Sequence, residues 1–343
     1  MSSSSPLRGG FIGCGFVSQY HLEAWKYVPR AELIAVCDHD PRRLEGAVAR
    51  VPEAHPYCDA GAMFAAGPLD FVEIATRPES HRQLIALAAG HGAHILCQKP
   101  AAPTRPDLLA MIEACDRAGV RLMFHENWRF RPWYRALRLA IDSGAIGRPI
   151  RLRIAHRDTR AIRPDGFADQ PYLAAMPRLI LMEMGCHLVD TARFLFGAIE
   201  RVTASLGRFG AGHPGEDLAT LMVGFRGGAL GLLDMSWCAP AEVARPEWAL
   251  NETVAEGTAG TLRLRIDGSL EWIGPDGRVE SRSVDLPPAD RVYLDGYVAT
   301  QAHFIEGLLQ GFEHETRALD TLATMDVVWA AYRSAETGRT IVL

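Results

Sequence analysis

The fold of this chain is decided by two stretches, LRGGFIGCGFVS at residues 7–18 and LIAVCD at residues 33–38. They predict a strand, a glycine loop from Gly13 to Ser18, a helix to about Tyr27 and a second strand that ends at Asp38. Strand, glycine loop, helix, strand and acid follow one another in the order that a dinucleotide-binding site requires.

The glycine loop has the residue types that the phosphates of a dinucleotide need. Gly13 allows a tight turn, and Gly15 has no side chain, so the backbone can approach a pyrophosphate. Ser18 is small enough for the helix to pack against the strand. The free N–H groups at the helix start, beside Phe16 and Val17, are expected to face the phosphates.

Asp38 lies where a carboxylate can accept hydrogen bonds from both ribose hydroxyls. The same carboxylate repels a 2′-phosphate, so the sequence favours NAD over NADP as the cofactor. Arg42 and Arg43 lie close by in the sequence and keep NADP as a minor alternative.

Composition and charge exclude several classes of protein. The chain has 343 residues, 48% of them hydrophobic and 22% charged, which is enough for two domains of a soluble globular protein. A net charge of −5 does not suggest a nucleic-acid surface, and no apolar run is long enough to span a membrane. The serine-rich residues 1–6 predict a disordered tail without a signal peptide, and seven scattered cysteines with no C-x-x-C pair favour a cytoplasmic protein.

The first 126 residues alternate between strands and helices. Beyond the glycine loop and Asp38, helices are expected at 41–50, 60–66, 79–91 and 104–118, and strands at 55–57, 69–75, 93–97 and 120–125. The strand at 69–75 is apolar apart from Asp70 near its start and Glu73, the odd polar member of the run. The alternation predicts an α/β domain at residues 7–126, with a parallel sheet and helices on both of its faces.

Residues 127–343 have a different pattern, with several hairpins joined by glycine turns. Strands are expected at 150–157, 217–225, 229–237, 261–266 and 270–273, and helices at 181–196, 297–310 and 318–336. This pattern predicts an α+β domain with an antiparallel-rich sheet, and its last helices are free to pack back on the first domain.

The junction NWRFRPWYR at residues 127–135 is rich in aromatic residues and arginine. On a basic protein such a run would indicate single-stranded nucleic acid, but this run is isolated and the chain is acidic. We therefore expect no nucleic-acid partner and place Asn127, Trp128 and Arg129 beside the cofactor, together with Gln98 and Lys99.

Lysine is scarce in this chain, because only Lys26 and Lys99 among 36 basic residues are lysine. A lysine that persists where arginine is preferred is more often needed for chemistry, since only an amine can shift its pKa readily and pass a proton. Lys99 also follows a strand of the predicted parallel sheet, at the edge where ligands bind. A surface lysine is the plain alternative, and we interpret Lys99 as functional.

Glu183, His187 and Asp190 share one face of the helix expected at 181–196. An imidazole held by a carboxylate is a general base with a fixed tautomer, and a structural histidine is the plain alternative. A metal site would need a third ligand, and neither His125 nor His156 has a spacing argument, so we expect no metal.

The segment ATRPESH at residues 75–81 follows an apolar strand and should lie on the cofactor side of the sheet. We expect Ala75, Thr76 and His81 to line the nicotinamide half of the site. A helix N-terminus is the alternative, for which Pro78 needs no special role.

The whole pattern resembles the glucose–fructose oxidoreductase, inositol dehydrogenase and MocA family (Gfo/Idh/MocA), almost from end to end. Lys99-Pro100 matches the family's E-K-P signature, and Glu183 to His187 sits where the family has D-x-x-x-H. Further matches are the glycine loop, Asp38, Thr76 with His81, the N-x-R-F segment at Asn127, EGTAGT at 256–261 and SAETGR at 334–339.

The resemblance implies a Rossmann domain and a second domain built on a large open, mostly antiparallel sheet with helices on one face, which commonly forms homodimers or homotetramers. It also implies hydride transfer between NAD(P) and a sugar or polyol. By this resemblance Lys99 and His187 have the catalytic roles: His187 takes the hydroxyl proton, and Lys99 hydrogen-bonds the same oxygen. Two residues depart from the family pattern, Gln98 for Glu and Glu183 for Asp, and both concern the substrate more than the reaction class.

Substrate contacts are expected from the loop DGFADQPYLAAMPR at residues 165–178 and from the strand before it. The junction NWRFRPWY at residues 127–134, combined with QPY and MPR in this loop, resembles some aldose dehydrogenases of the family, which suggests a pentose such as apiose. The expected contacts, besides Lys99, Glu183 and His187, are Arg157, Asp165, Tyr172 and Arg178.

Two other functions fit the same sequence. A sugar sensor would bind NAD without turnover, but a sensor needs neither Lys99 nor His187. NAD-dependent cleavage of a glycoside, in which the cofactor is restored within one turnover, would have nearly the same sequence signature.

Overall fold

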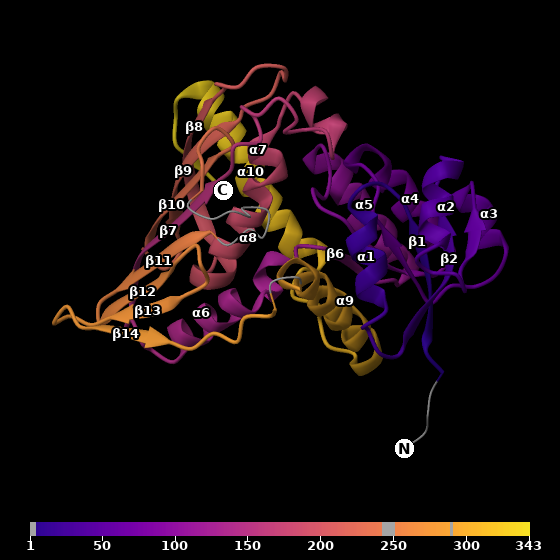
Figure 1. Cartoon of the computed structure of the whole chain (residues 1–343), viewed down its shortest axis with the longest axis horizontal. Coiled ribbons are helices and arrows are strands. Elements are labelled where there is room, and N and C mark those ends of the chain that lie inside the picture. Colours follow the sequence, from indigo (N-terminus) through magenta and orange to yellow (C-terminus); the bar gives the residue numbers. More distant parts are fainter. Residues whose placement is uncertain (1–4, 242–250, 289–290) are drawn as a thin grey trace. The chain divides into compact units, whose positions relative to one another are not determined.

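The computed structural model of the chain describes residues 5–241, 251–288 and 291–343, so residues 1–4 of the predicted tail lie outside the described ranges. The chain divides into two compact units. The first comprises residues 1–127 and 294–323, and the second comprises residues 128–293 and 324–343. Each unit contains one sheet (Figure 1).

The first unit contains a six-stranded parallel sheet in the order β3-β2-β1-β4-β5-β6, which confirms the predicted Rossmann architecture. Its elements are β1 (Leu7–Ile12), α1 (Ser18–Trp25), β2 (Ala31–Cys37), α2 (Pro41–Val48), β3 (His55–Tyr57), α3 (Ala60–Ala65), β4 (Phe71–Ile74), α4 (Pro78–Gly90), β5 (His94–Cys97), α5 (Arg105–Ala118), β6 (Leu122–Phe124) and most of α9 (Val292–Gln310).

The helices of the first unit begin where side chains can replace missing backbone acceptors. Asp40, Asp59 and Thr104 precede α2, α3 and α5, and each accepts a hydrogen bond from a first-turn N–H. Gly119, with a φ of 66°, ends α5 in the left-handed conformation that glycine tolerates best. These caps explain why the sequence pattern located the helix starts well.

A segment from far along the chain completes the first unit. The Thr316 hydroxyl donates a hydrogen bond of 2.7 Å to the carbonyl of Phe124, and the Phe124 N–H donates one of 3.0 Å to the carbonyl of Thr316. On α9, the ring of Phe304 is fully buried and meets Phe71 of β4 edge-on at 6.1 Å. The core of this unit therefore includes side chains from residues 294–323.

The second unit contains a nine-stranded sheet in the order β14-β13-β12-β11-β7-β10-β9-β8-β15. It is antiparallel except where β7 pairs in parallel with β10, so the predicted antiparallel-rich sheet is confirmed. Its elements are η1 (Trp128–Phe130), α6 (Pro132–Asp142), β7 (Pro149–Arg157), η2 (Pro171–Ala175), α7 (Ile180–Glu183), α8 (Gly185–Phe196), β8 (Ile199–Gly207), β9 (Leu218–Phe225), β10 (Leu230–Ser236), β11 (Glu252–Gly257), β12 (Gly260–Leu264), β13 (Leu270–Ile273), β14 (Val279–Arg282), most of α10 (Ala318–Thr337) and β15 (Ile341–Val342).

The two faces of the nine-stranded sheet differ. Helices α7 and α8 pack on one face, where Ile154, Leu221 and Leu233 are fully buried (Figure 1). Residues of alternate register on the same strands, such as Arg153 and Met222, are exposed. The sheet is therefore covered by helices on one face, as predicted.

The predicted helix at 181–196 is wrong in one respect, because it is two helices. The chain breaks at Met184, and α8 starts at Gly185. A Cβ at Gly185 would lie 2.6 Å from the side chain of Leu181, so the break brings the backbone close to the preceding turn. Among the described residues, none of the helices is long and apolar enough to span a membrane.

Candidate active site

The glycine loop has the backbone that the sequence predicts. Gly13 has a φ of 100°, and a Cβ there would lie 2.7 Å from Thr76 Cγ2 and 2.8 Å from the carbonyl group of Ala75. A Cβ at Gly15 would meet nothing within 4 Å. Gly13 is therefore required by the backbone, whereas Gly15 leaves the open space that a close phosphate group would fill.

Asp38 has a second task that the sequence did not reveal. Its buried carboxylate accepts a hydrogen bond of 2.6 Å from the N–H of Cys14 and one of 2.8 Å from the N–H of Asp40. These bonds to an ionised acceptor fix the glycine loop against the end of β2. A carboxylate has further lone pairs, so the expected contact with a ribose remains chemically compatible.

Other predicted cofactor residues lie around the loop. Phe16 is exposed, Val17 is partly exposed, and Arg43 lies 3.5 Å from Asp40 on the surface of α2. Burial and the Asp38 carboxylate raise the pKa of the Cys14 thiol to about 12, so this side chain stays neutral within the loop.

The segment after β4 is fixed by His81, which is completely buried on α4. One ring nitrogen lies 3.0 Å from the carbonyl of Ala101 and the other lies 3.1 Å from the carbonyl of Thr76. Burial lowers the pKa of His81 against the raising effect of these two carbonyls. This arrangement favours a structural role for His81 over the predicted contact with the nicotinamide, while Ala75 and Thr76 lie at the end of β4 as expected.

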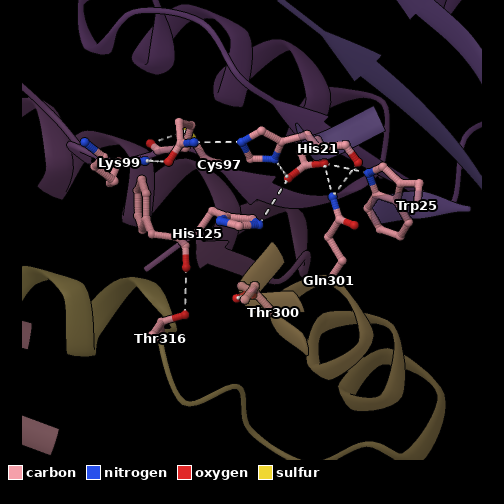
Figure 2. Close-up of polar contacts among 12 residues, drawn as sticks. His21, Trp25, Cys97, Lys99, His125, Thr300, Gln301 and Thr316 are labelled. Carbon is pink, nitrogen blue, oxygen red and sulfur yellow. Dashed lines mark hydrogen bonds and ion pairs between the residues drawn. The ribbon is translucent and has the colours of Figure 1, made fainter. Parts of the chain in front are cut away.

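Lys99 lies just past the end of β5 and is partly buried. Its main-chain N–H donates a hydrogen bond of 2.7 Å to Oε1 of Gln98, the residue that replaces the glutamate of the family pattern. The Gln98 side chain extends into the interior of the unit, where its Nε2 lies 2.7 Å from Nε2 of His21 (Figure 2). The sequence pattern did not single out His21, and it noted Glu73, the residue behind it, only as an odd polar member of its strand.

In the second unit, an aromatic ring fixes the plane of His187. The indole of Trp128 stacks on this imidazole with ring centroids 4.5 Å apart and an interplanar angle of 7°. Both residues are buried, Trp128 on η1 and His187 on the first turns of α8. Glu183 is buried at the end of α7, so it precedes His187 across the helix break instead of on one continuous helix.

Arg129 and Asp190 form a buried ion pair one turn beyond His187. Arg129 donates from Nε to one carboxylate oxygen at 2.8 Å and from Nη2 to the other at 2.5 Å. The side-chain exposures are 6% and 0%. This bidentate pair connects η1 to α8 and gives Arg129 a structural role beside its predicted contact with the cofactor.

Comparison with protein families decides the identity of this architecture. Residues 7–126 match the model described as the oxidoreductase family with an NAD-binding Rossmann fold, and residues 134–263 match the Gfo/Idh/MocA C-terminal domain. The chain belongs to the Gfo/Idh/MocA family. It is accordingly an NAD-binding oxidoreductase, and the prediction of NAD as cofactor is confirmed.

Known proteins resemble the chain over nearly all of its length. It is 40% identical to D-apiose dehydrogenase from Paraburkholderia graminis, over 98% of this chain and 90% of the relative. It is 38% identical to D-apiose dehydrogenase from Rhizobium rhizogenes, over 98% of this chain and 97% of the relative. A crystal structure of an oxidoreductase from Agrobacterium radiobacter in complex with NAD⁺, L-tartaric acid and magnesium is 36% identical, with a TM-score of 0.92 and 98% of both chains covered.

The predicted substrate residues of this family member all lie in the second unit, apart from Lys99. Arg157, at the end of β7, pairs with Asp234 of β10. Tyr172, on η2, donates a hydrogen bond of 3.1 Å to Gln170. Asp165 is exposed, and Arg178 lies over the ring of Tyr332 at 4.6 Å. The residues 157–178 therefore carry polar groups along one connected segment.

Proposed function

We propose that this protein is an NAD-dependent dehydrogenase of a sugar or polyol, with D-apiose as the first substrate to test. The observation that supports the proposal best is the similarity to two D-apiose dehydrogenases over nearly the full length of the chain. Because this similarity covers both the NAD-binding unit and the sheet unit, it includes the segments expected to contact cofactor and substrate.

We assign the acid–base chemistry to Lys99 and His187, following the family resemblance. His187 would take the proton of the reacting hydroxyl, and Lys99 would hydrogen-bond the same oxygen as negative charge develops on it. Bound NAD supplies the hydride acceptor. The stacked indole of Trp128 supports this role for His187, because it restricts rotation of the imidazole and shields one of its faces.

The specificity for a polyhydroxylated substrate is assigned to Glu183, Arg157, Asp165, Tyr172 and Arg178. All five side chains can donate or accept hydrogen bonds, as recognition of several hydroxyl groups requires. We further propose that the helix-free face of the nine-stranded sheet mediates a homodimer or homotetramer, supported by its exposed apolar residues Met222 and Leu230. Seven free cysteines support a cytoplasmic location.

The test is NADH absorbance after purified protein is mixed with NAD and D-apiose, other pentoses, polyols or uronates, with NADP in parallel. Absorbance that rises with D-apiose or with another of these sugars supports the proposal and names the substrate. Tight NAD binding without any NADH formation would contradict it and favour a sensor, and glycoside cleavage without net NADH would favour the redox-neutral reaction.

The catalytic assignment has its own controls. Lys99→Ala and His187→Ala should each lose most turnover and still bind NAD, as measured by calorimetry. Near-full activity in either variant would refute the role of that residue without touching the proposed substrate class.

A further inference from the structure

A buried chain of hydrogen bonds leads from β4 to the main chain of Lys99 (Figure 2). Glu73 of β4, His21 of α1 and Gln98 have exposures of 0%, 0% and 7%. Glu73 Oε1 lies 2.7 Å from Nδ1 of His21, Nε2 of His21 lies 2.7 Å from Nε2 of Gln98, and Oε1 of Gln98 lies 2.7 Å from the N of Lys99.

The donor and acceptor groups of these residues fix the direction of each hydrogen bond in the series. A main-chain N–H can only donate, so the Gln98 oxygen must face Lys99 and the Gln98 NH₂ group must face His21. That NH₂ group can only donate, so Nε2 of His21 accepts and its Nδ1 carries the proton. Nδ1 then donates to Glu73. The contacts thus assign the tautomer of His21.

The series of hydrogen bonds ends at the carboxylate of Glu73, whose hydrogen-bond partners all donate, and Nε2 of His125 lies 3.8 Å from its Oε1. Its Oε2 accepts 2.6 Å from the indole N–H of Trp25 and 3.0 Å from Nε2 of Gln301, a residue of α9. Together with His21, three donors converge on one buried carboxylate. Such a carboxylate is satisfied in its ionised form.

The same side chains also form a geometric group of metal-ligating types, since atoms of His21, Glu73 and His125 lie within 4.8 Å of one another. A metal would need the lone pair of His21 Nδ1, but that nitrogen carries the proton donated to Glu73. The hydrogen-bonded arrangement therefore describes this group better than a cation site does. Other rings also lie against the His21 ring. The distances between ring centroids are 4.7 Å to Tyr297 of α9, 4.5 Å to His125 and 6.0 Å to Phe11 of β1.

We propose that Glu73, His21 and Gln98 are positioning residues that hold the main chain of Lys99, and that they tolerate a carboxylate on only one side of His21. The effect on turnover rests on the proposed function, because it acts through Lys99. The proposal also accounts for the departure from the family pattern: with Glu73 on one side of the imidazole, position 98 needs an amide.

Donors and acceptors can be counted for each exchange. Gln98→Glu places His21 between two carboxylates with a single N–H to donate, so one contact lacks a proton. Glu73→Gln replaces one carboxylate oxygen by an NH₂ donor, although the hydrogen-bond partners of Glu73 are themselves donors. One contact then has two donors and no acceptor. In the double variant each contact again has one donor and one acceptor, but the hydrogen bonds of His21 run in the opposite direction. Glu at 98 accepts from Lys99 and from Nε2 of His21, while Gln at 73 donates to Nδ1.

The test is the cycle of Gln98→Glu, Glu73→Gln and the double variant, measured with NAD and the sugar that the protein oxidises. Each single variant should lose roughly tenfold or more in kcat, since a small displacement of a catalytic group is costly, and the double variant should recover most of it. The ratio of Gln98→Glu to wild-type activity should rise as the pH falls from about 8 to about 6, because the missing proton is then supplied. Gln83→Glu, the same substitution on the exposed face of α4, should change neither kcat nor the pH dependence of the activity.

A measurement on the NAD-free protein separates this inference from the proposed function. The ¹⁵N chemical shifts of His21 should show protonated Nδ1 in the wild type and protonated Nε2 in the double variant. If they do so while no sugar is oxidised, the proposed function fails and the hydrogen-bond chain stands. A wild-type ring protonated on Nε2, or a double variant with the summed losses of both single variants in kcat and thermal stability, would overturn the inference.

Discussion

Asp190→Asn removes the negative charge of the buried ion pair and leaves its shape almost unchanged. Arg129 then keeps a guanidinium that is 6% exposed and faces a neutral amide, whose NH₂ group meets another donor. Arg129 also lies 5.6 Å from the ring of Phe194, which cannot replace a carboxylate. The variant therefore removes the bidentate carboxylate partner of a buried guanidinium inside the second unit.

The burial of this ion pair determines how much Asp190→Asn should lower the stability of the second unit. Removing one partner of a buried ion pair typically destabilises a protein by about 3–5 kcal/mol. For a unit of this size, about 1 kcal/mol corresponds to roughly 2–4 °C in melting temperature, so the second unit should melt roughly 10 °C lower. Asp142→Asn is the matched control, because Asp142 pairs with Arg138 at 2.8 Å on the surface of α6, with exposures of 52% and 37%. An exposed helical pair of this kind contributes about 0.3–0.5 kcal/mol, which predicts a shift of about 1 °C.

Calorimetry gives the melting temperature of each variant and of the wild type. A further variant, Arg129→Met combined with Asp190→Leu, removes both charges and should recover much of the lost stability. The reasoning is refuted if Asp190→Asn melts within about 2 °C of Asp142→Asn, because the buried charge would then have found another partner.

Three further predictions concern the first unit. Gly15→Ala should fold as the wild type does but bind NAD roughly tenfold or more weakly, because its Cβ enters open space, whereas Gly13→Ala should cost about 1–3 kcal/mol through its φ of 100°. Asp38→Ala should weaken NAD binding without creating useful NADP binding, because it also releases the N–H of Cys14 from the glycine loop. His314, whose pKa is lowered to about 4 by burial, should make the protein acid-sensitive. Because the unfolded chain takes up this proton first, the stabilisation is complete above about pH 6.5 and is lost as the pH falls through about 4, up to about 3 kcal/mol.

Calorimetric titration with NAD and NADP, and urea unfolding at several pH values, check these expectations. Asp59→Ala, which removes the N-cap of α3, controls for general destabilisation in the Asp38 experiment. Equal NAD affinity of Gly15→Ala and the wild type, or NADP binding by Asp38→Ala as tight as wild-type NAD binding, would contradict the first two predictions. In the third, His314→Gln should lose the acid sensitivity, and an unchanged pH profile would show that another group causes it.

Most helices and strands of the first unit could be predicted from the sequence because the signals that mark them are local. Caps such as Asp40 and Thr104, and apolar runs that end in glycine or a polar residue, lie within a few positions of the elements they define. The second unit was harder. Strands β8, β11, β14 and β15 and helix α6 were not predicted, and strands such as Glu252–Gly257 carry few apolar residues and depend on cross-strand partners.

The residues of the candidate site show the same difference between local and long-range signals. Gly13, Asp38 and Lys99 could be located by their distance from strand ends, but the partners of these residues could not. Glu73 looked out of place in an apolar strand, and its explanation requires Gln301, which is 228 positions away. Likewise, a helical period does not reveal that the Gly185 backbone comes close to the side chain of Leu181 next to the break at Met184.

The discontinuous first unit has a consequence for how the protein is made. A ribosome finishes the six strands of the parallel sheet long before residues 294–323 leave the exit tunnel. Until then, the carboxylate of Glu73 lacks its bond from Gln301, and Phe71 lacks the ring of Phe304. The nascent Rossmann sheet therefore has part of its core uncovered while strands β7 to β14 of the second sheet are translated. Its final closure comes late, after almost the entire chain has been synthesised.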